Sequence, residues 1–340
     1  MSIIDRFRLV APRTPSSQTA FGMSARLDPL ATPIDGEALR AEIIDHLAQS
    51  ELALAAHDSA HELLVPGHKP IRFSSRHSLT PNNRLDFYEE TTTLLIAYLI
   101  ERFRPAVFFD IGAGIGYFSR IATSHATCEL EVHAFEMRPD RLAQLKANVA
   151  SDPFGSRVHA HLIGLTDAHK GESDIHYASS ILFETTPEAG DYRERWRWLK
   201  FNVRGGFNRD FASAKVLMTS LDHFCESRSV RPDLLKIDVD GYEGRVLEGG
   251  AGMLRRHKPF VLLELHKDKK LRFGVHRRDI ANGLFDLGYK ALFLTDHQNR
   301  LTCDVVSVSR GDPLIARQET DLILFYHPDY PSVRRAAPAV

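Results

Sequence analysis

The sequence is poor in cysteine and contains no long hydrophobic run, and each shortage excludes a class of protein. Its 340 residues include three cysteines, Cys128, Cys225 and Cys303, which lie far apart and form no CxxC pair. Because the cysteines are few and odd in number, they argue against a disulfide framework or a cysteine-based zinc site, and they favour the reducing cytoplasm. Apolar runs such as residues 94–100 fall far short of the roughly 20 residues of a membrane-spanning helix. We therefore expect a cytoplasmic protein with no membrane span.

An excess of charge of either sign is also absent. Lys and Arg number 43 against 44 Asp and Glu, which leaves a net charge of -1. A chain so balanced has no general attraction for nucleic acid or for an anionic membrane. Hydrophobic residues make up 43% of the sequence, which is ordinary for a globular protein. The composition thus gives no general reason to expect a nucleic-acid-binding or membrane-binding protein, although it does not exclude a local basic patch.

The chain divides into three parts by pattern. Residues 1–35 are rich in Pro, Ser, Thr and Ala and predict a flexible tail. Residues 36–84 predict a helical and loop extension, and residues 85–330 a main domain with an insertion at about 178–214, too long for an ordinary connection. In the main domain short apolar segments alternate with helical ones, which predicts an α/β fold with a mostly parallel, Rossmann-like sheet and helices on both faces. The predicted strands are residues 106–110, 131–135, 158–163, 234–238, 260–265, 291–294 and 322–326.

A glycine-rich loop follows the first of these strands. The strand ends in Asp110, and the glycines follow as G-x-G-x-G, whereas a dinucleotide-binding loop requires G-x-G-x-x-G. An acid before the loop would repel a pyrophosphate, but it suits the cationic amino end of S-adenosylmethionine (SAM), so SAM is favoured over NAD and over a turn without ligand. The loop's predicted cofactor-binding residues are Asp110, Gly112, Ala113, Gly114, Gly116 and Tyr117.

Two further acids follow the next strands. Glu136 ends the second strand, where a carboxylate can accept hydrogen bonds from both ribose hydroxyls. Asp167 follows the third strand, where it could meet the adenine amino group, although a turn-forming Asp is an equal alternative. Both are predicted cofactor-binding residues.

Five stretches of the chain resemble the FkbM family of methyltransferases. They are DIGAGIGYFS (110–119), TSLD (219–222), PDLLKIDVDGYE (232–243), VLEGG (246–250) and PFVLLELH (259–266). The resemblance implies a SAM-dependent O-methyltransferase with a seven-stranded sheet, acting on hydroxyls of sugars, glycolipids, polysaccharides or polyketides. The chain departs from the family at Asp240, where Glu is more usual, and in the long segment after Tyr177.

The ends of the fourth and fifth strands supply candidate catalytic groups. Lys236 and Asp238 share one strand face, as do Glu264 and His266, because side chains two apart on a strand point the same way. Asp238 could orient the acceptor or act as a base, and Lys236 could be its electrostatic partner or only a solvated strand residue. His266 could be the general base, because an unperturbed imidazole titrates near neutral pH. The alternative for His266 is a structural histidine bonded to a neighbouring carboxylate. A divalent metal ion held by Asp238, Glu264 and His266 with Asp240 is an alternative that we do not favour, because no strict ligand spacing supports it.

The predicted insertion mixes aromatic and basic residues. Trp196, Arg197 and Trp198 stand at its centre and are the predicted substrate-binding residues, because aromatic faces stack on sugars and arginines bind phosphate or carboxylate. The alternative is a helix that packs its aromatics on the domain or on a second subunit, as in a homo-oligomer. An acidic or phosphorylated glycan is the acceptor that this segment favours.

The sequence thus predicts a SAM-dependent O-methyltransferase acting on a sugar, glycolipid, polysaccharide or other small molecule. An RNA 2'-O-methyltransferase is the first alternative, since arginine–aromatic mixtures also bind single strands, but no Lys-Asp-Lys-Glu set is evident. A SAM-binding protein without catalysis is the second alternative, and the polar groups at Asp238, Glu264 and His266 argue against it.

Overall fold

The predicted strands form the centre of one large sheet. A computed structural model describes residues 33–50, 53–57, 60–64, 71–73, 89–150, 155–178, 181–183, 196, 199 and 212–330. The seven predicted strands lie side by side in the order β6-β5-β4-β10-β11-β14-β12. Their bounds are β4 (Val107–Ile111), β5 (Glu131–Glu136), β6 (Val158–Leu165), β10 (Leu234–Ile237), β11 (Phe260–Leu265), β12 (Lys290–Leu294) and β14 (Asp321–Tyr326).

The centre of the sheet is parallel and its two edges are antiparallel. Strands β6, β5, β4, β10 and β11 pair in parallel, and β14 runs against both β11 and β12. This order confirms the predicted Rossmann-like α/β fold, in which ligands bind beyond the carboxyl ends of the parallel strands.

The sheet is larger than predicted, with eleven strands in the described part of the chain instead of seven. Strand β9 (Ala212–Thr219) extends it beyond β6, followed by β7 (Gly171–Ala178) and β8 (Ile181–Phe183), while β13 (Val305–Val308) pairs with β12. Edge strands bury one face or less, so they lack the continuous apolar run that marks a central parallel strand. Strand β7, with the sequence GESDIHYA, shows this polar pattern.

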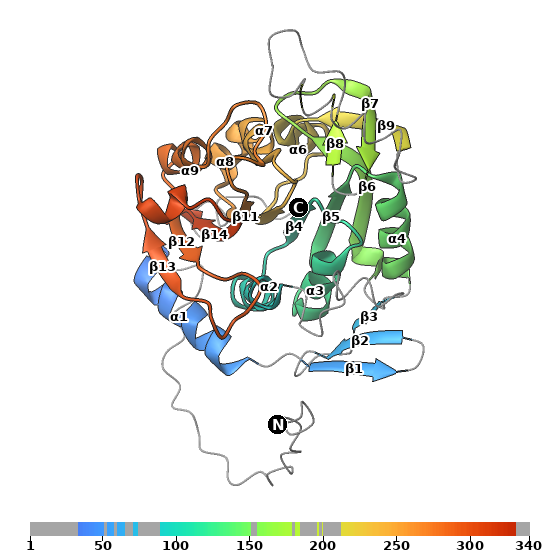
Figure 1. The fold of residues 1–340 in the computed structure, drawn as a ribbon. Coiled ribbons are helices and arrows are strands. Elements are labelled where there is room, and N and C mark those ends of the chain that lie inside the picture. The colour runs from blue at the N-terminus through green and yellow to red at the C-terminus, as the bar shows by residue number, and fades with distance from the viewer. Residues whose placement is uncertain are drawn as a thin grey trace, which may run out of the picture.

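Helices cover both faces of the sheet (Figure 1), as predicted. Successive strand residues alternate between two cores, so Phe108 packs with one and Phe109 with the other. On the first face lie α1 (Gly36–Gln49), α2 (Glu90–Phe103), α3 (Tyr117–His125) and α4 (Pro139–Ala150). On the second lie α6 (Leu221–Arg228), α7 (Glu243–Glu248), α8 (Ala251–His257) and α9 (Arg277–Asp286). Single 3-10 turns, η3 (Gly155–Arg157) and η4 (Pro313–Ala316), complete the described elements.

The N-terminal extension holds more regular structure than predicted. Helix α1 is present, with the Asp35 side chain accepting hydrogen bonds from the backbone at its first turn. Within the predicted helical and loop extension, β1 (Ala53–His57), β2 (Ala60–Leu64) and β3 (Ile71–Phe73) form a small antiparallel sheet that the sequence did not predict. Residues 1–32 of the predicted tail lie outside the described residues.

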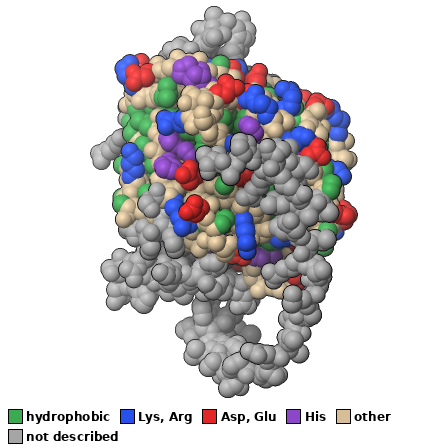
Figure 2. Space-filling view, turned by 180° about the vertical axis from the view of Figure 1, so that it is seen from behind, with side chains coloured by type: hydrophobic (Ala, Val, Ile, Leu, Met, Phe, Trp, Pro, Cys, Tyr) green, Lys and Arg blue, Asp and Glu red, His purple; other side chains and the backbone are tan. Residues whose placement is uncertain are grey.

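Charged side chains of both signs are interspersed over the described part of the face shown in Figure 2. Within the described ranges, no helix combines the length and apolar character that crossing a membrane requires.

Candidate active site

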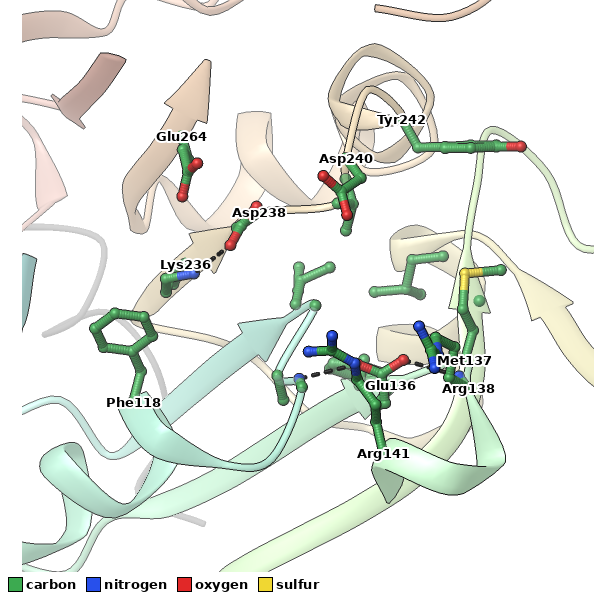
Figure 3. A pocket seen from close by; sticks show the side chains of 18 of the residues that line it. Phe118, Glu136, Met137, Arg138, Arg141, Lys236, Asp238, Asp240, Tyr242 and Glu264 are labelled. Carbon is green, nitrogen blue, oxygen red and sulfur yellow. Dashed lines mark hydrogen bonds and ion pairs between the residues drawn. The ribbon is translucent and has the colours of Figure 1, made fainter. Parts of the chain in front are cut away.

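A pocket of about 680 Å³ opens at the carboxyl ends of the central strands, a volume typical of small-ligand sites. Its walls come from the ends of β4, β5, β6, β9, β10 and β11, from the loops after β4, β5, β10 and β11, and from the start of α3 and α4 (Figure 3). Of the residues predicted from sequence, the lining includes Gly112, Ala113, Gly114, Tyr117, Glu136, Lys236, Asp238, Glu264 and His266.

The glycine loop takes the strained path that its glycines were predicted to allow. Gly112 has a φ of +82°, and a Cβ there would lie 1.8 Å from the backbone oxygen of Asp238. Only glycine lets the loops after β4 and β10 approach so closely. Gly114, with a φ of +56°, turns its N–H toward Glu136 and donates a 2.9 Å hydrogen bond to its carboxylate. Gly116 starts α3 and lies outside the described lining.

Asp110 lies beneath the pocket and does not line it in the described structure, which places it away from its predicted contact with the cofactor's amino group. It is fully buried, and the Ser119 hydroxyl donates a 2.6 Å hydrogen bond to it. Burial raises the pKa of Asp110, and the neighbouring Lys236, its register partner on β10, opposes that rise. Asp110 therefore interacts electrostatically with Lys236, and it is Lys236 that lines the pocket.

Glu136 stands at the end of β5 as predicted. One carboxylate oxygen accepts the Gly114 N–H and the other accepts the Arg138 N–H at 2.8 Å. Burial raises the pKa of Glu136, while these hydrogen bonds and Arg141 lower it. Each oxygen still has a second lone pair, so the group can accept a pair of hydroxyl hydrogens.

An apolar section of the pocket lies beyond Glu136, lined by Met137, Ile163, Leu165 and Met218. Asp167, predicted to meet an adenine amino group here, is not among the described lining residues. Its carboxylate is instead held by Arg245 at 2.5 Å and by Lys170 at 3.7 Å. These ion pairs hold Asp167 outside the described lining, and its role toward the cofactor stays a prediction.

On the other side of the pocket, Lys236 is buried among carboxyl groups. The sequence predicted that it shares a face with Asp238 but not that it is buried. Its Nζ lies 3.3 Å from Asp238 Oδ2 and 4.5 Å from the centre of the Phe118 ring. Burial alone would lower the pKa of Lys236, but Asp238 and the nearby carboxyls of Glu89 and Glu264 raise it. Burial raises the pKa of Asp238, and Lys236 and His266 more than offset this, so that pKa is lowered overall.

Glu264 near the end of β11 and His266 directly after the strand lie next to this group, with His266 Nε2 3.6 Å from Glu264 Oε1. Burial and the Asp238 charge raise the pKa of Glu264 well above its usual range, which favours its protonated form. The other ring nitrogen of His266, Nδ1, lies 2.6 Å from Glu243, a fully buried carboxylate at the start of α7.

Sequence reasoning missed Glu243 because nothing in the chain pairs it with a histidine 23 positions later. Its place within the motif 232–243 was the available signal. It also missed several polar or aromatic lining residues, among them Glu89, Phe118, Arg138, Arg141, Tyr242 and Arg272.

The predicted substrate segment is only partly described. Trp196 is helical and 57% exposed, and Arg197 and Trp198 lie outside the described residues.

The pocket's residues fit SAM. Glu136 offers lone pairs for vicinal ribose hydroxyls, the apolar section suits a purine ring, and the acidic side formed with Asp238 suits the cationic methionine end. Gly112, Ala113 and Gly114 line the pocket, so the main chain of the glycine loop can approach a ligand. The donor atoms of Asp238, Glu264 and His266 also lie within 4.8 Å of one another. The Lys236 ammonium already supplies a positive charge beside this acidic group.

The chain was compared with family models, with characterised proteins and with solved structures. The methyltransferase FkbM domain matches residues 110–291, more than half of the chain. The hexuronic acid methyltransferase AglP of Haloferax volcanii is 26% identical over 217 residues, which cover 63% of this chain and 72% of AglP. The crystal structure of a methyltransferase FkbM from Methylobacillus flagellatus is 14% identical with a TM-score of 0.40, and the match covers 72% of this chain and 56% of that one.

An O-methyltransferase of Bacillus cereus in complex with SAH is 10% identical, with a TM-score of 0.39, covering 73% of this chain and 85% of that one. The family assignment rests on the domain match, which includes the glycine loop, the strand ends and the acidic group described above. This protein belongs to the FkbM family of SAM-dependent methyltransferases.

Proposed function

We propose that the protein transfers the SAM methyl group to a hydroxyl oxygen of a sugar-type acceptor. The observation that carries this proposal is the hydrogen bond between Glu243 and His266 Nδ1, at 2.6 Å. A hydroxyl must lose its proton during methyl transfer and therefore benefits from a base held in position. A carboxylate acceptor, already ionised at neutral pH, has no such need.

His266 acts as that base. When Nδ1–H donates to Glu243, the lone pair of the imidazole resides on Nε2, which lies on the side of Glu264 and Asp240. Both His266 and Glu264 line the pocket. Glu243 is a positioning residue, since it fixes the ring and stabilises the imidazolium that forms, as the carboxylate does in a Ser-His-Asp triad.

SAM, when bound, supplies an electrophilic methyl group on a sulfonium centre. The chain's own residues hold the acceptor oxygen in line with that methyl group. Glu264, favoured in its protonated form, can donate a hydrogen bond to the acceptor, and the Asp238 carboxylate can accept one from a neighbouring hydroxyl of the acceptor, which leaves the proton of the reacting hydroxyl to His266. Lys236 keeps Asp238 ionised by its charge at 3.3 Å.

The acceptor side of the pocket supports a sugar. Tyr242, Lys270 and Arg272 line it, and the Arg272 guanidinium lies 5.5 Å from the centre of the Tyr242 ring. Aromatic rings stack on sugar rings and cationic groups attract acidic ones. The relative AglP is named as a methyltransferase of hexuronic acid, an acidic sugar, so we propose an acidic glycan as acceptor.

The test compares His266→Ala and Glu243→Gln with the wild-type protein on a panel of neutral and acidic sugars, with S-adenosylhomocysteine release as the readout. We expect kcat to fall about 10²–10⁴-fold in His266→Ala. In Glu243→Gln we expect a smaller fall in kcat, with the acceptor KM and the SAM Kd unchanged. A His266→Ala variant whose kcat stays within threefold of the wild-type value would rule out His266 as the base. Resistance of the product to mild alkali distinguishes an ether from a methyl ester.

The segment around Trp196 remains a proposed acceptor-binding lid. Trp196 is 57% exposed, as a residue that contacts a ligand from outside would be. Trp196→Ala should raise the acceptor KM about 10-fold or more with the SAM Kd unchanged. An unchanged KM in a folded variant would assign the tryptophan to an interface.

The two alternative functions have distinct outcomes. Single-stranded RNA that is methylated, and whose binding weakens steeply with salt, would favour an RNA 2'-O-methyltransferase. Tight SAM binding with no turnover on any acceptor would favour a SAM-binding protein without catalysis.

A further inference from the structure

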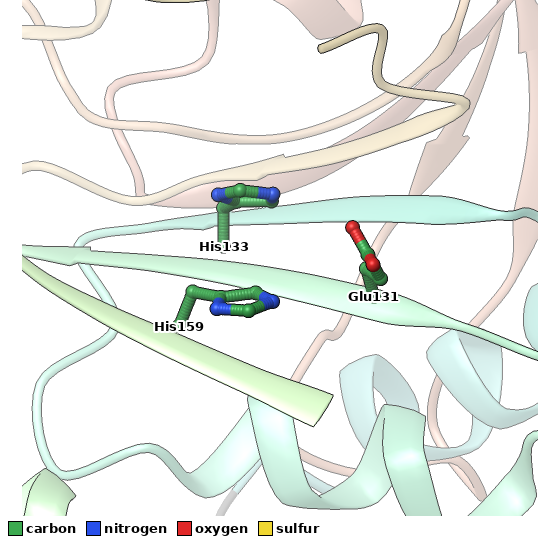
Figure 4. A group of neighbouring side chains, drawn as sticks. All are labelled: Glu131, His133 and His159. Carbon is green, nitrogen blue, oxygen red and sulfur yellow. The ribbon is translucent and has the colours of Figure 1, made fainter. Parts of the chain in front are cut away.

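A second cluster of potential ligands lies at the opposite end of the sheet from the pocket. Glu131 begins β5, and His159 is the second residue of β6. His133, two residues after Glu131, is the register partner of His159, so all three side chains emerge on one face of the sheet (Figure 4). The pocket residue Glu136 stands at the other end of β5, so the two groups are separated by the length of the strand.

The cluster brings three donor atoms within 4.8 Å of one another, one from each side chain. Glu131 and His159 are exposed, while His133 is only 8% exposed. Ligand atoms at about 2.1 Å from a tetrahedral ion lie roughly 3.4 Å apart. The exposed side chains of Glu131 and His159 can close the remaining distance, which is at most about 1.4 Å, by rotation.

His133 is held as a metal ligand would be. Its Nδ1 lies 3.0 Å from Nε2 of His161, and the two rings are stacked at an angle of 6°. Its Nε2 is buried and has no hydrogen-bond partner in the part of the chain that the structure describes. In Figure 4 one ring nitrogen of His133 points to the side of Glu131.

The tautomer of His133 follows from this geometry. An N–H on the buried Nε2 would be an unsatisfied donor, which costs free energy. The proton is better placed on Nδ1, where it is donated to His161. This leaves a lone pair on Nε2 that faces the cluster, and a hydrogen bond from the second ring nitrogen is the usual support for a metal-bound histidine.

Burial and nearby positive groups lower the pKa of His133 and of His161. Burial, together with His161, His159 and Arg228, lowers the pKa of His133 to about 3. Burial, Arg228 and His159 lower the pKa of His161 to about 4. Arg228 is exposed to solvent, which screens its charge, and its guanidinium stacks on Phe224.

We propose that Glu131, His133 and His159 bind a divalent transition-metal ion of the zinc class. Two imidazole nitrogens and one carboxylate oxygen are ligands that Zn²⁺ prefers, and water completes a tetrahedral site. His161 supports the ring of His133 from the second ring nitrogen. The ion links β5 to β6, so it stabilises the folded state and takes no part in methyl transfer. The proposal is independent of the acceptor and of the base proposed above.

The experiment uses the full-length protein, freed of metal with EDTA and then titrated with Zn²⁺ alone by calorimetry. Thermal unfolding is followed with and without Zn²⁺. The variants are His159→Ala and Glu131→Gln, which change exposed ligands, and the control is His176→Ala, a histidine on β7 outside the cluster. Co²⁺ serves as a spectroscopic probe, because tetrahedral Co²⁺ absorbs visible light strongly.

We expect one Zn²⁺ per chain in the wild type and in His176→Ala, and a rise in Tm of at least about 3 °C at saturating metal. In His159→Ala and Glu131→Gln the affinity should fall at least 10-fold and the rise in Tm should disappear, with methyl transfer unchanged. Absence of binding to the wild type would overturn the proposal. So would binding that survives both variants, which would place the ion elsewhere, such as at Asp238, Glu264 and His266.

Discussion

Replacing Lys236 by Met removes a positive charge from a group of buried carboxyl side chains. The lysine side chain is 1% exposed, and its Nζ lies 3.3 Å from Asp238 Oδ2. At that distance, with an effective dielectric constant of about 20, the attraction is about 5 kcal/mol. Burial of the ammonium group offsets part of this gain. Breaking such a pair nevertheless costs about 3–5 kcal/mol, because a charge is left unpaired. Since Asp238 is 22% exposed, we expect the lower end, about 3 kcal/mol, at pH 7.

The loss of unfolding free energy in Lys236→Met should depend on pH in a defined direction. The pKa of Lys236 is raised in the folded state, so its stabilising contribution is fully present at any pH below the unfolded value of about 10.4. The wild type therefore keeps this contribution from pH 5 to 8. In the variant, Asp238 and Glu264 lose their counter-charge and bind protons more readily. The deficit in unfolding free energy should shrink as the pH falls from 8 to 5.

Urea unfolding followed by circular dichroism at four pH values between 5 and 8 measures both effects. Lys215→Met is the matched control, since Lys215 and its partner Asp174 are 3.6 Å apart but 70% and 64% exposed. Exposed pairs contribute about 1 kcal/mol or less. The reasoning would be refuted if Lys236→Met lowered the unfolding free energy no more than Lys215→Met and by the same amount at every pH. The buried Lys236 charge would then not stabilise the folded state.

Three further predictions concern single sites. Gly112→Ala should cost at least about 2 kcal/mol of unfolding free energy and weaken SAM binding, because its Cβ would lie 1.8 Å from a backbone oxygen. The control is Gly171→Ala, which has a φ of +78° and open space around it and should cost only about 1 kcal/mol. Glu136→Gln should raise the SAM Kd about 10-fold in calorimetry, whereas an equal effect of Asp167→Asn would contradict its position outside the pocket. Because the pKa of Glu264 is raised in the folded state, wild-type stability falls as the pH rises through that pKa. Glu264→Gln should remove this fall in urea titrations at pH 5 to 9. An unchanged dependence of the unfolding free energy on pH would contradict the prediction.

The sequence alone determined the fold class and the location of the site. Central strands such as β4 and β10 are buried on both faces, so they appear as short apolar runs that local pattern detects. The glycine loop is equally local, because positive φ angles at Gly112 and Gly114 are a property of a few adjacent residues. Edge strands such as β7 are fixed by pairing with a distant strand, and their own residues carry little signal.

Only the tertiary structure decided which acids reach the pocket. Asp110, Glu136 and Asp167 each follow or end a strand, and the sequence treats them alike. Packing buries Asp110 beside Lys236 and leaves Glu136 facing the pocket, while Arg245, 78 positions away, engages Asp167. The contact between Glu243 and His266 is of the same kind. Local sequence specifies where a side chain leaves its strand, but its partner depends on how distant segments pack, and that partner decides its chemistry.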